Sequence, residues 1–343
     1  MIDSIKKRTF RICLLLLLMI PIAGCAHTSS PDLASDAATQ DSVKESVIAE
    51  TVIPETAVPR SSSDKSVKTP IRDNTPVVLV PKATGSVTYS NPTETAVIDA
   101  SHTSDGYIMA NYTGTNPKVK LLITGINNVT YSYDLHGTGY EVFPLTSGNG
   151  VYTVAIYEHL VDSRYSMALS KEIDAVIENE FSPYLYPNQY VNFDDSAKAI
   201  TLAADLAAKS STDLDAISSI YNYIISHISY DHDKANNVQR GYLPDIDDTL
   251  ATGEGICFDY AAVMASMLRS QRIPTRLEIG YSGESYHAWI STYIAEIGWI
   301  NGIIEFDGRS WILMDPTFAA SSSEKALKKF IGDGTNYITE YVY

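Results

Sequence analysis

The 343-residue sequence is 45% hydrophobic and 19% charged, a composition typical of a globular protein with room for two domains. Its 25 basic and 41 acidic residues give a net charge of −16. This balance argues against a nucleic-acid partner, because phosphate binding requires a basic surface. The sequence contains no His-Glu-x-x-His, Cys-x-x-Cys, Gly-x-Ser-x-Gly or phosphate-binding loop, so it gives no support to a metalloprotease, a zinc module, a serine hydrolase or an NTPase.

The first 25 residues have the parts of an export signal. Four basic residues lie between positions 6 and 11, an apolar run covers residues 12–20, and small residues precede Cys25. The run is too short for an ordinary transmembrane helix. The pattern is similar to a bacterial lipobox, so we expect residues 1–24 to be a signal peptide and Cys25 to carry a lipid that anchors the chain to the outer face of the cell membrane. The alternative is a cleaved signal peptide followed by an incidental cysteine.

Residues 25–84 are predicted to be a disordered tether. This stretch is rich in Ser, Thr, Asp, Ala and Pro and shows no sustained hydrophobic period. The proline-flanked segment 76–81 is either a first strand or an extended stretch.

Residues 85–177 predict an antiparallel, Ig-like β-sandwich. Strand-like segments with turn signals between them follow one another at a spacing of about ten residues. They cover residues 107–112, 119–124, 130–135, 140–145, 151–158 and 165–169. His102, His136 and His159 in this region lack metal-ligand spacing, so we interpret them as ordinary surface or strand residues.

Residues 178–343 predict an α+β domain. Residues 181–193 are too apolar and aromatic to be left in water, which indicates an ordered connector. Helices are expected over residues 199–208, after the capping sequence Ser211-Thr212-Asp213, and from Cys257 to about residue 270. Strands follow at residues 276–281, 286–294, 299–306 and 310–315, the last two as a hairpin, and residues 337–343 are expected to return to the sheet.

Three residues in this region can act together chemically. Cys257 begins a helix, where the positive end of the helix dipole favours a thiolate. His287 lies on a strand and Asp315 ends another, so the sheet lets both emerge at one edge with the Cys257 helix across them. A Cys, a His and an Asp in this arrangement can serve as nucleophile, base and orienting carboxylate.

Five blocks of residues occur in order between positions 204 and 319: Gly255-Ile256-Cys257-Phe258-Asp259-Tyr260-Ala261, Arg272-Ile273-Pro274-Thr275-Arg276, Gly280-Tyr281, His287-Ala288-Trp289 and Met314-Asp315-Pro316-Thr317. Together they resemble the transglutaminase-like superfamily. The resemblance implies a papain-like α+β core with Cys257 as nucleophile, His287 as base and Asp315 as the carboxylate that orients it. The sequence departs from the family at Arg272, where a Gly is usual, and at Phe318, where a Trp is frequent. The segment between the base and the carboxylate is longer than usual by about one hairpin.

The function expected from these residues is acyl transfer from an amide bond or a glutamine carboxamide of a protein or cell-wall peptide. Water as acceptor gives hydrolysis and a lysine amine gives crosslinking, and the sequence leaves this choice open. The alternative is a non-catalytic binding or scaffold lipoprotein with the same fold. No cofactor or metal is expected.

Six other residues in this region have a weaker signal. Tyr260 and Trp289 are candidates to line the site, although a Trp beside the base is as easily core packing. Asp259 is interpreted as a helix first-turn carboxylate rather than a participant in catalysis. The sequence Asp231-His232-Asp233 is interpreted as a solvated helix end rather than a metal cluster.

Overall fold

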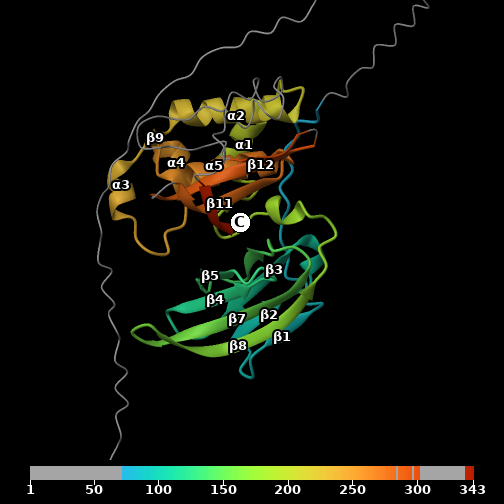
Figure 1. Ribbon diagram of the computed structural model, residues 1–343, viewed down its shortest axis with the longest axis vertical. Helices are drawn as coiled ribbons and strands as arrows, with labels where there is room; N and C mark the ends of the chain where they lie inside the picture. Colours follow the sequence, from blue (N-terminus) through green and yellow to red (C-terminus); the bar gives the residue numbers. More distant parts are fainter. Residues whose placement is uncertain (1–71, 283–284, 296, 302–336) are drawn as a thin grey trace, which may run out of the picture. The chain divides into compact units, whose positions relative to one another are not determined.

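The computed structural model describes residues 72–343, except residues 283–284, 296 and 302–336 (Figure 1). Two antiparallel four-stranded sheets come first. One has the order β1-β2-β3-β6 and consists of β1 (Thr88–Ser90), β2 (Ala96–Asp99), β3 (Tyr107–Tyr112) and β6 (Glu141–Pro144). The other has the order β5-β4-β7-β8 and consists of β4 (Val119–Thr124), β5 (Thr130–Leu135), β7 (Gly150–Val161) and β8 (Arg164–Ala175).

The two sheets share one core. Alternation along each strand places every second side chain on the inner face of its sheet. Ile98 and Ile108 from the first sheet and Leu121 and Val154 from the second are fully buried in one hydrophobic cluster. Two sheets joined through their inner faces form a β-sandwich, which confirms this part of the predicted fold class.

The predicted strands of the sandwich agree well with the observed ones, but two were missed. β1 and β2 have three and four residues, too few to show an alternating pattern in the sequence. The segment 76–81 forms no strand, so of the two alternatives the strand is wrong. The connector is buried as expected, with Tyr184 of the short 3-10 helix η2 (Ser182–Tyr184), Val191 and Phe193 in the core.

The rest of the chain is a mixed layer of helices and an antiparallel sheet. The described helices are α1 (Lys198–Ala207), α2 (Asp213–His227), α3 (His232–Asn237), α4 (Ile246–Thr252) and α5 (Cys257–Ser270). The sheet has the order β13-β12-β11-β14, with β11 (Thr275–Ser282), β12 (Ser285–Ile294), β13 (Gly298–Asn301) and β14 (Tyr337–Val342). β14 pairs with β11, which confirms that the tail returns to the sheet. The predicted strand at 310–315 lies outside the described residues, and α3 and α4 were not predicted.

Helix α5 is the centre of this domain. Every residue from Asp259 to Ser270 is buried, and the helix contacts α1, α2 and α4 as well as β11 and β12 (Figure 1). Small and apolar residues surround its whole circumference, as expected of a helix inside a core. None of the helices in the described ranges combines the length and the apolar composition that crossing a bilayer requires.

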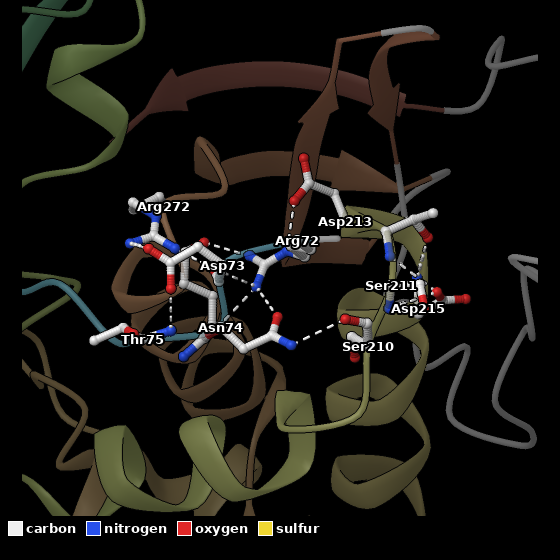
Figure 2. A network of polar contacts seen from close by, with 11 residues as sticks. Arg72, Asp73, Asn74, Thr75, Ser210, Ser211, Asp213, Asp215 and Arg272 are labelled. Atoms are coloured by element: carbon white, nitrogen blue, oxygen red, sulfur yellow. Dashed lines mark hydrogen bonds and ion pairs between the residues drawn. The ribbon is translucent and has the colours of Figure 1, made fainter. Parts of the chain in front are cut away.

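The last part of the predicted tether is not a free chain. Figure 2 shows Arg72 bonded through Nε to Oδ1 of Asp213 at 2.7 Å, and Asn74 donating to the carbonyl of Ser210 at 2.9 Å. The backbone N–H of Val77 donates to the carbonyl of Ser270 at 2.7 Å. The prediction of disorder up to residue 84 is therefore wrong for residues 72–77, because their partners lie more than 130 residues away in the sequence.

Candidate active site

Two glycines determine the path of the backbone into Cys257. Gly253 ends α4 with a φ of 67°, and its N–H donates to the carbonyl of Thr249. Gly255 pairs with Tyr230 between the short parallel strands β9 (Ser229–Tyr230) and β10 (Glu254–Gly255). A Cβ at Gly255 would lie 2.9 Å from the Cβ of Asp259, so only a residue without a side chain fits at this entry to α5.

Asp259 caps the start of α5. Its Oδ2 accepts the N–H of Ile256 at 2.8 Å, which supplies a partner that the helix itself cannot offer. The interpretation of Asp259 as a first-turn carboxylate is thus confirmed. The structure adds two partners that the sequence did not suggest, the hydroxyl of Tyr242 at 2.5 Å from Oδ1 and the ammonium group of Lys234 at 2.7 Å from Oδ2. This fully buried carboxylate therefore connects α5 to α3 and the loop that follows it.

The thiol of Cys257 is a half-buried free cysteine at the first position of α5. Burial raises its pKa, and the backbone N–H groups of Ala288 and Phe258 only partly offset this effect. The sequence-based expectation was the opposite, a thiolate favoured by the helix dipole. Loss of hydration outweighs the helix terminus here because the protein packs closely around the sulfur.

His287 lies on β12, opposite Gly280 of β11. Its side chain is 8% exposed, and among the described residues its Nε2 has no hydrogen-bond partner. Burial lowers the pKa of His287 to about 4, so the imidazole is neutral at physiological pH. Asp315, the predicted third member, lies outside the described residues.

Cys257 and His287 line the same cavity, which has a volume of about 300 Å³. One wall comes from α3 and the following loop, with Ala235, Val238 and Tyr242, and another from β11 and β12. The described lining residues include no Asp, Glu, Lys or Arg. The space around the thiol is therefore apolar and suits an uncharged group.

The comparison with protein families matches residues 200–316 to the transglutaminase-like superfamily. This segment begins within α1 and contains α2 to α5, Cys257, His287 and position 315. Residues 200–316 form a transglutaminase-like domain. The prediction made from the five sequence blocks is confirmed at this level.

The chain also has low similarity to solved structures. A candidate cysteine protease from Cytophaga hutchinsonii is 17% identical, with a TM-score of 0.33, and the match covers 57% of this chain and 77% of that one. A candidate protease from Parabacteroides distasonis is 17% identical, with a TM-score of 0.27, and the match covers 43% of this chain and 35% of that one. Red sea bream transglutaminase is 13% identical, with a TM-score of 0.32, and the match covers 66% of this chain and 53% of that one. These scores are too low to identify a shared activity, and the comparison with curated proteins gives no significant match.

Tyr230 is a residue of the transglutaminase-like domain whose place at the site was not predicted. It lines the cavity together with Cys257. Burial, followed by the nearby thiol, raises the pKa of Tyr230 to about 12, so it stays a neutral hydroxyl. Its position shortly after α2 can be read from the sequence, but its place beside a residue 27 positions away cannot.

Two predicted lining residues do not reach the cavity. Tyr260 is fully buried, and its hydroxyl donates to the carbonyl of Ile228 at 2.5 Å. Trp289 is 2% exposed, and its Nε1 donates to Glu278 at 3.2 Å. Both are core residues of the transglutaminase-like domain. Position 260 lies on a helix that is buried all round, and position 289 lies two pairs along the sheet from the base.

No group of three or more metal-ligating side chains occurs within the described ranges. Asp231 is the N-cap of α3, where its Oδ1 accepts the N–H of Lys234 at 2.8 Å, and His232 and Asp233 are exposed, so this segment is a solvated helix end as predicted, although it begins α3 rather than ending α2. In the β-sandwich, His102 and His136 each contact a carboxylate, those of Asp105 and Glu141.

Proposed function

We propose that the transglutaminase-like domain transfers acyl groups through Cys257, using amide bonds or glutamine carboxamides of proteins or cell-wall peptides. One observation carries the proposal. A thiol at the start of a buried helix and an imidazole from the neighbouring sheet line one cavity, although 30 residues separate Cys257 from His287. An apolar cavity of about 300 Å³ gives an uncharged side chain or amide access to both groups.

Asp315 is the proposed partner of His287. A buried imidazole nitrogen without a partner is costly, and the Nε2 atom has none among the described residues. Asp315 belongs to the segment that matches the family. Its carboxylate would accept the Nε2–H, orient the ring and stabilise the imidazolium that forms during the reaction.

The proposed steps follow from the neutral resting state of the pair. As the sulfur of Cys257 attacks the carbonyl carbon, its proton passes to His287, so that a buried thiol reacts without first becoming a free thiolate. Backbone N–H groups, including that of Cys257, stabilise the oxyanion. The imidazolium then gives its proton to the departing ammonia or amine, and a thioester remains on the sulfur. Water resolves it to a carboxylic acid, and a lysine amine resolves it to a new amide.

The second candidate is a binding or scaffold protein without activity. One observation favours it, the raised pKa of Cys257 together with the lowered pKa of His287. Both shifts disfavour a reactive ion pair, and a buried neutral cysteine is otherwise an inert small apolar group.

Alkylation of the full chain by iodoacetamide separates the two candidates. The modification is quantified on the peptide that contains Cys257 between pH 6 and pH 10. Catalysis predicts labelling at pH 6 to 7 that is lost in His287→Gln, because the base is then absent. If labelling begins only above the pH at which an ordinary thiol ionises, and is equal in the parent and in His287→Gln, the result would support the binding or scaffold protein instead.

The acceptor is identified in a separate assay. Incorporation of a fluorescent primary amine into a glutamine-bearing protein, absent in Cys257→Ala, supports transfer. New carboxylates or N-termini without amine incorporation support hydrolysis.

We further propose that the chain is exported and held at the outer face of the cell membrane through a lipid on Cys25. The support is the lipobox-like sequence before this residue. Radiolabelled palmitate should enter the full-length protein and not the Cys25→Ala variant, and equal labelling of both would contradict the anchor.

A further inference from the structure

A second and larger cavity, with a volume of about 910 Å³, lies where the loop after α3 meets the β-sandwich. Its walls include Lys118, Lys120 and Asp134 from the β4 and β5 region, together with Arg240 from the loop. All these residues belong to one compact unit of the chain. The reaction proposed for Cys257 assigns no role to this groove.

The groove and the Cys257 cavity meet at one residue. Gly241 lines both of them, and a Cβ at this position would lie 3.3 Å from Oδ2 of Asp134 on β5. On the same loop, Val238 and Tyr242 line the Cys257 cavity, whereas Arg240 lines the groove. The loop 238–242 thus contributes to the walls of both cavities.

The charge of the groove differs from that of the molecule. The chain has a net charge of −16, yet the groove is lined by Lys118, Lys120 and Arg240 and by only one described carboxylate, that of Asp134. Lys120 and Asp134 form an ion pair at 2.5 Å and neutralise each other. Lys118 and Arg240 are exposed, and within the described ranges neither has an ion-pair partner. Two uncommitted positive charges therefore face a groove in an otherwise acidic protein.

We infer that this groove binds a carboxylate-bearing segment of the same peptide whose amide group reaches Cys257. The inference rests on the proposed function and gives its substrate a class, a peptide with an uncharged group at the reacting position and acidic residues a few positions away. The cavity at the thiol has no charged wall to attract such a peptide, so the attraction comes from Lys118 and Arg240. In an acidic protein a local positive site also directs an acidic ligand to the correct face.

The test measures binding rather than turnover, so that it is independent of catalysis. Fluorescein-labelled hexaglutamate, hexaglutamine and hexalysine are titrated with the full chain carrying Cys257→Ala, and binding is read from fluorescence polarisation. We expect hexaglutamate to bind best, added salt to weaken it, and the double variant Lys118→Glu/Arg240→Glu to bind it about tenfold more weakly. Equal affinity for hexaglutamate and hexaglutamine, no binding of hexaglutamate, or unchanged affinity in the double variant would overturn the inference.

A matched variant controls for net charge. Lys171→Glu/Lys209→Glu changes the charge of the chain by the same amount at exposed positions that line neither cavity, and it should bind hexaglutamate as the parent does. An equal loss in this control would show a general charge effect and refute the groove. Where the double reversal lowers the unfolding temperature, Lys118→Gln/Arg240→Gln replaces it, with a smaller loss expected. If the protein binds hexaglutamate but has no activity, the inference about the groove stands and the proposed enzymatic function fails. If it is active but does not prefer hexaglutamate, the enzymatic function stands and the inference about the groove fails.

Discussion

Replacing Tyr242 with Phe tests whether Asp259 holds the loop after α3 against α5. The change removes one donor, whose acceptor is a fully buried carboxylate oxygen 2.5 Å away, and it keeps the ring that forms the cavity wall. A hydrogen bond to a charged group contributes about 1.5–3 kcal/mol. Tyr242 is half-buried, so water can replace part of the loss, and we expect the free energy of unfolding to fall by about 2 kcal/mol.

Urea denaturation of the full chain measures this change, with Tyr286→Phe as the control. Tyr286 lines the same cavity but is 57% exposed, so its variant should stay within about 0.5 kcal/mol of the parent. The Lys234 ammonium contacts Asp259 at 2.7 Å and lies 4.6 Å from the centre of the Tyr242 ring. A double-mutant cycle with Lys234→Met should therefore show a coupling of about 1 kcal/mol between the two partners of the carboxylate.

The same variant should change the cavity. With the loop less firmly held, iodoacetamide should reach Cys257 faster in Tyr242→Phe than in the parent at the same pH, because the loop forms one wall around the thiol. A variant with the parent's stability and alkylation rate would refute the reasoning, since the short contact to Asp259 would then contribute nothing. Lower stability with an unchanged rate would show that the loop does not control access.

Three further outcomes follow from the site. Burial lowers the pKa of His287 to about 4, and a charged carboxylate beside the imidazole would act in the opposite direction, so in an NMR titration His287 should titrate at a lower pH in Asp315→Ala than in the parent; equal values would contradict the triad. Burial, and then the bond to Asp259, raises the pKa of Tyr242 from 10 to about 12. Its contribution to stability is complete below pH 10 and is lost as the pH rises through 12, so Tyr242→Phe should lose less stability over this range in urea titrations. Gly280→Ala would push a methyl group against the carbonyl oxygen of Ile338 and should lower the free energy of unfolding by about 3 kcal/mol. An unchanged thermal midpoint would show that β14 can shift to make room for the methyl group.

Local signals made much of the fold predictable. Helix α2 begins where the sequence places its cap, with the hydroxyl of Thr212 accepting the N–H of Asp215 and the Asp215 carboxylate accepting the N–H of Thr212. In the sandwich, burial alternates along β4 and β5, and in β5 it follows an alternation of polar and apolar residues in the sequence. Cys257 begins α5 as predicted, because the glycines before it and the cap at Asp259 lie within six residues of one another.

Features that depend on distant partners were not predictable in the same way. Nothing in the sequence around Arg72 indicates that its guanidinium meets Asp213, 141 residues later. Helices α3 and α4 are short and polar. Their region matters because Lys234 and Tyr242 both contact the buried carboxylate of Asp259. The pKa of Cys257 was predicted in the wrong direction for a related reason. The helix dipole is a local property that can be read from the sequence, whereas burial depends on every element packed around the sulfur.

Helix α5 explains why the chemistry and the long-range contacts are compatible in one domain. Its 14 residues are about 21 Å long, so the thiol at one end is separated from the residues that bind the 72–77 segment at the other. Near that second end, Arg269 is buried and donates to the carbonyls of Tyr186, Thr275 and Tyr343, which joins the connector, β11 and the end of the chain to one guanidinium group. A buried arginine is tolerated when all its donors have acceptors, and three separate segments must be in place to provide them. The end of α5 opposite Cys257 is thus fixed by contacts from four parts of the chain. The first turn, in contrast, is held by Asp259, through Ile256, Tyr242 and Lys234, and by Tyr260, whose hydroxyl donates to the carbonyl of Ile228.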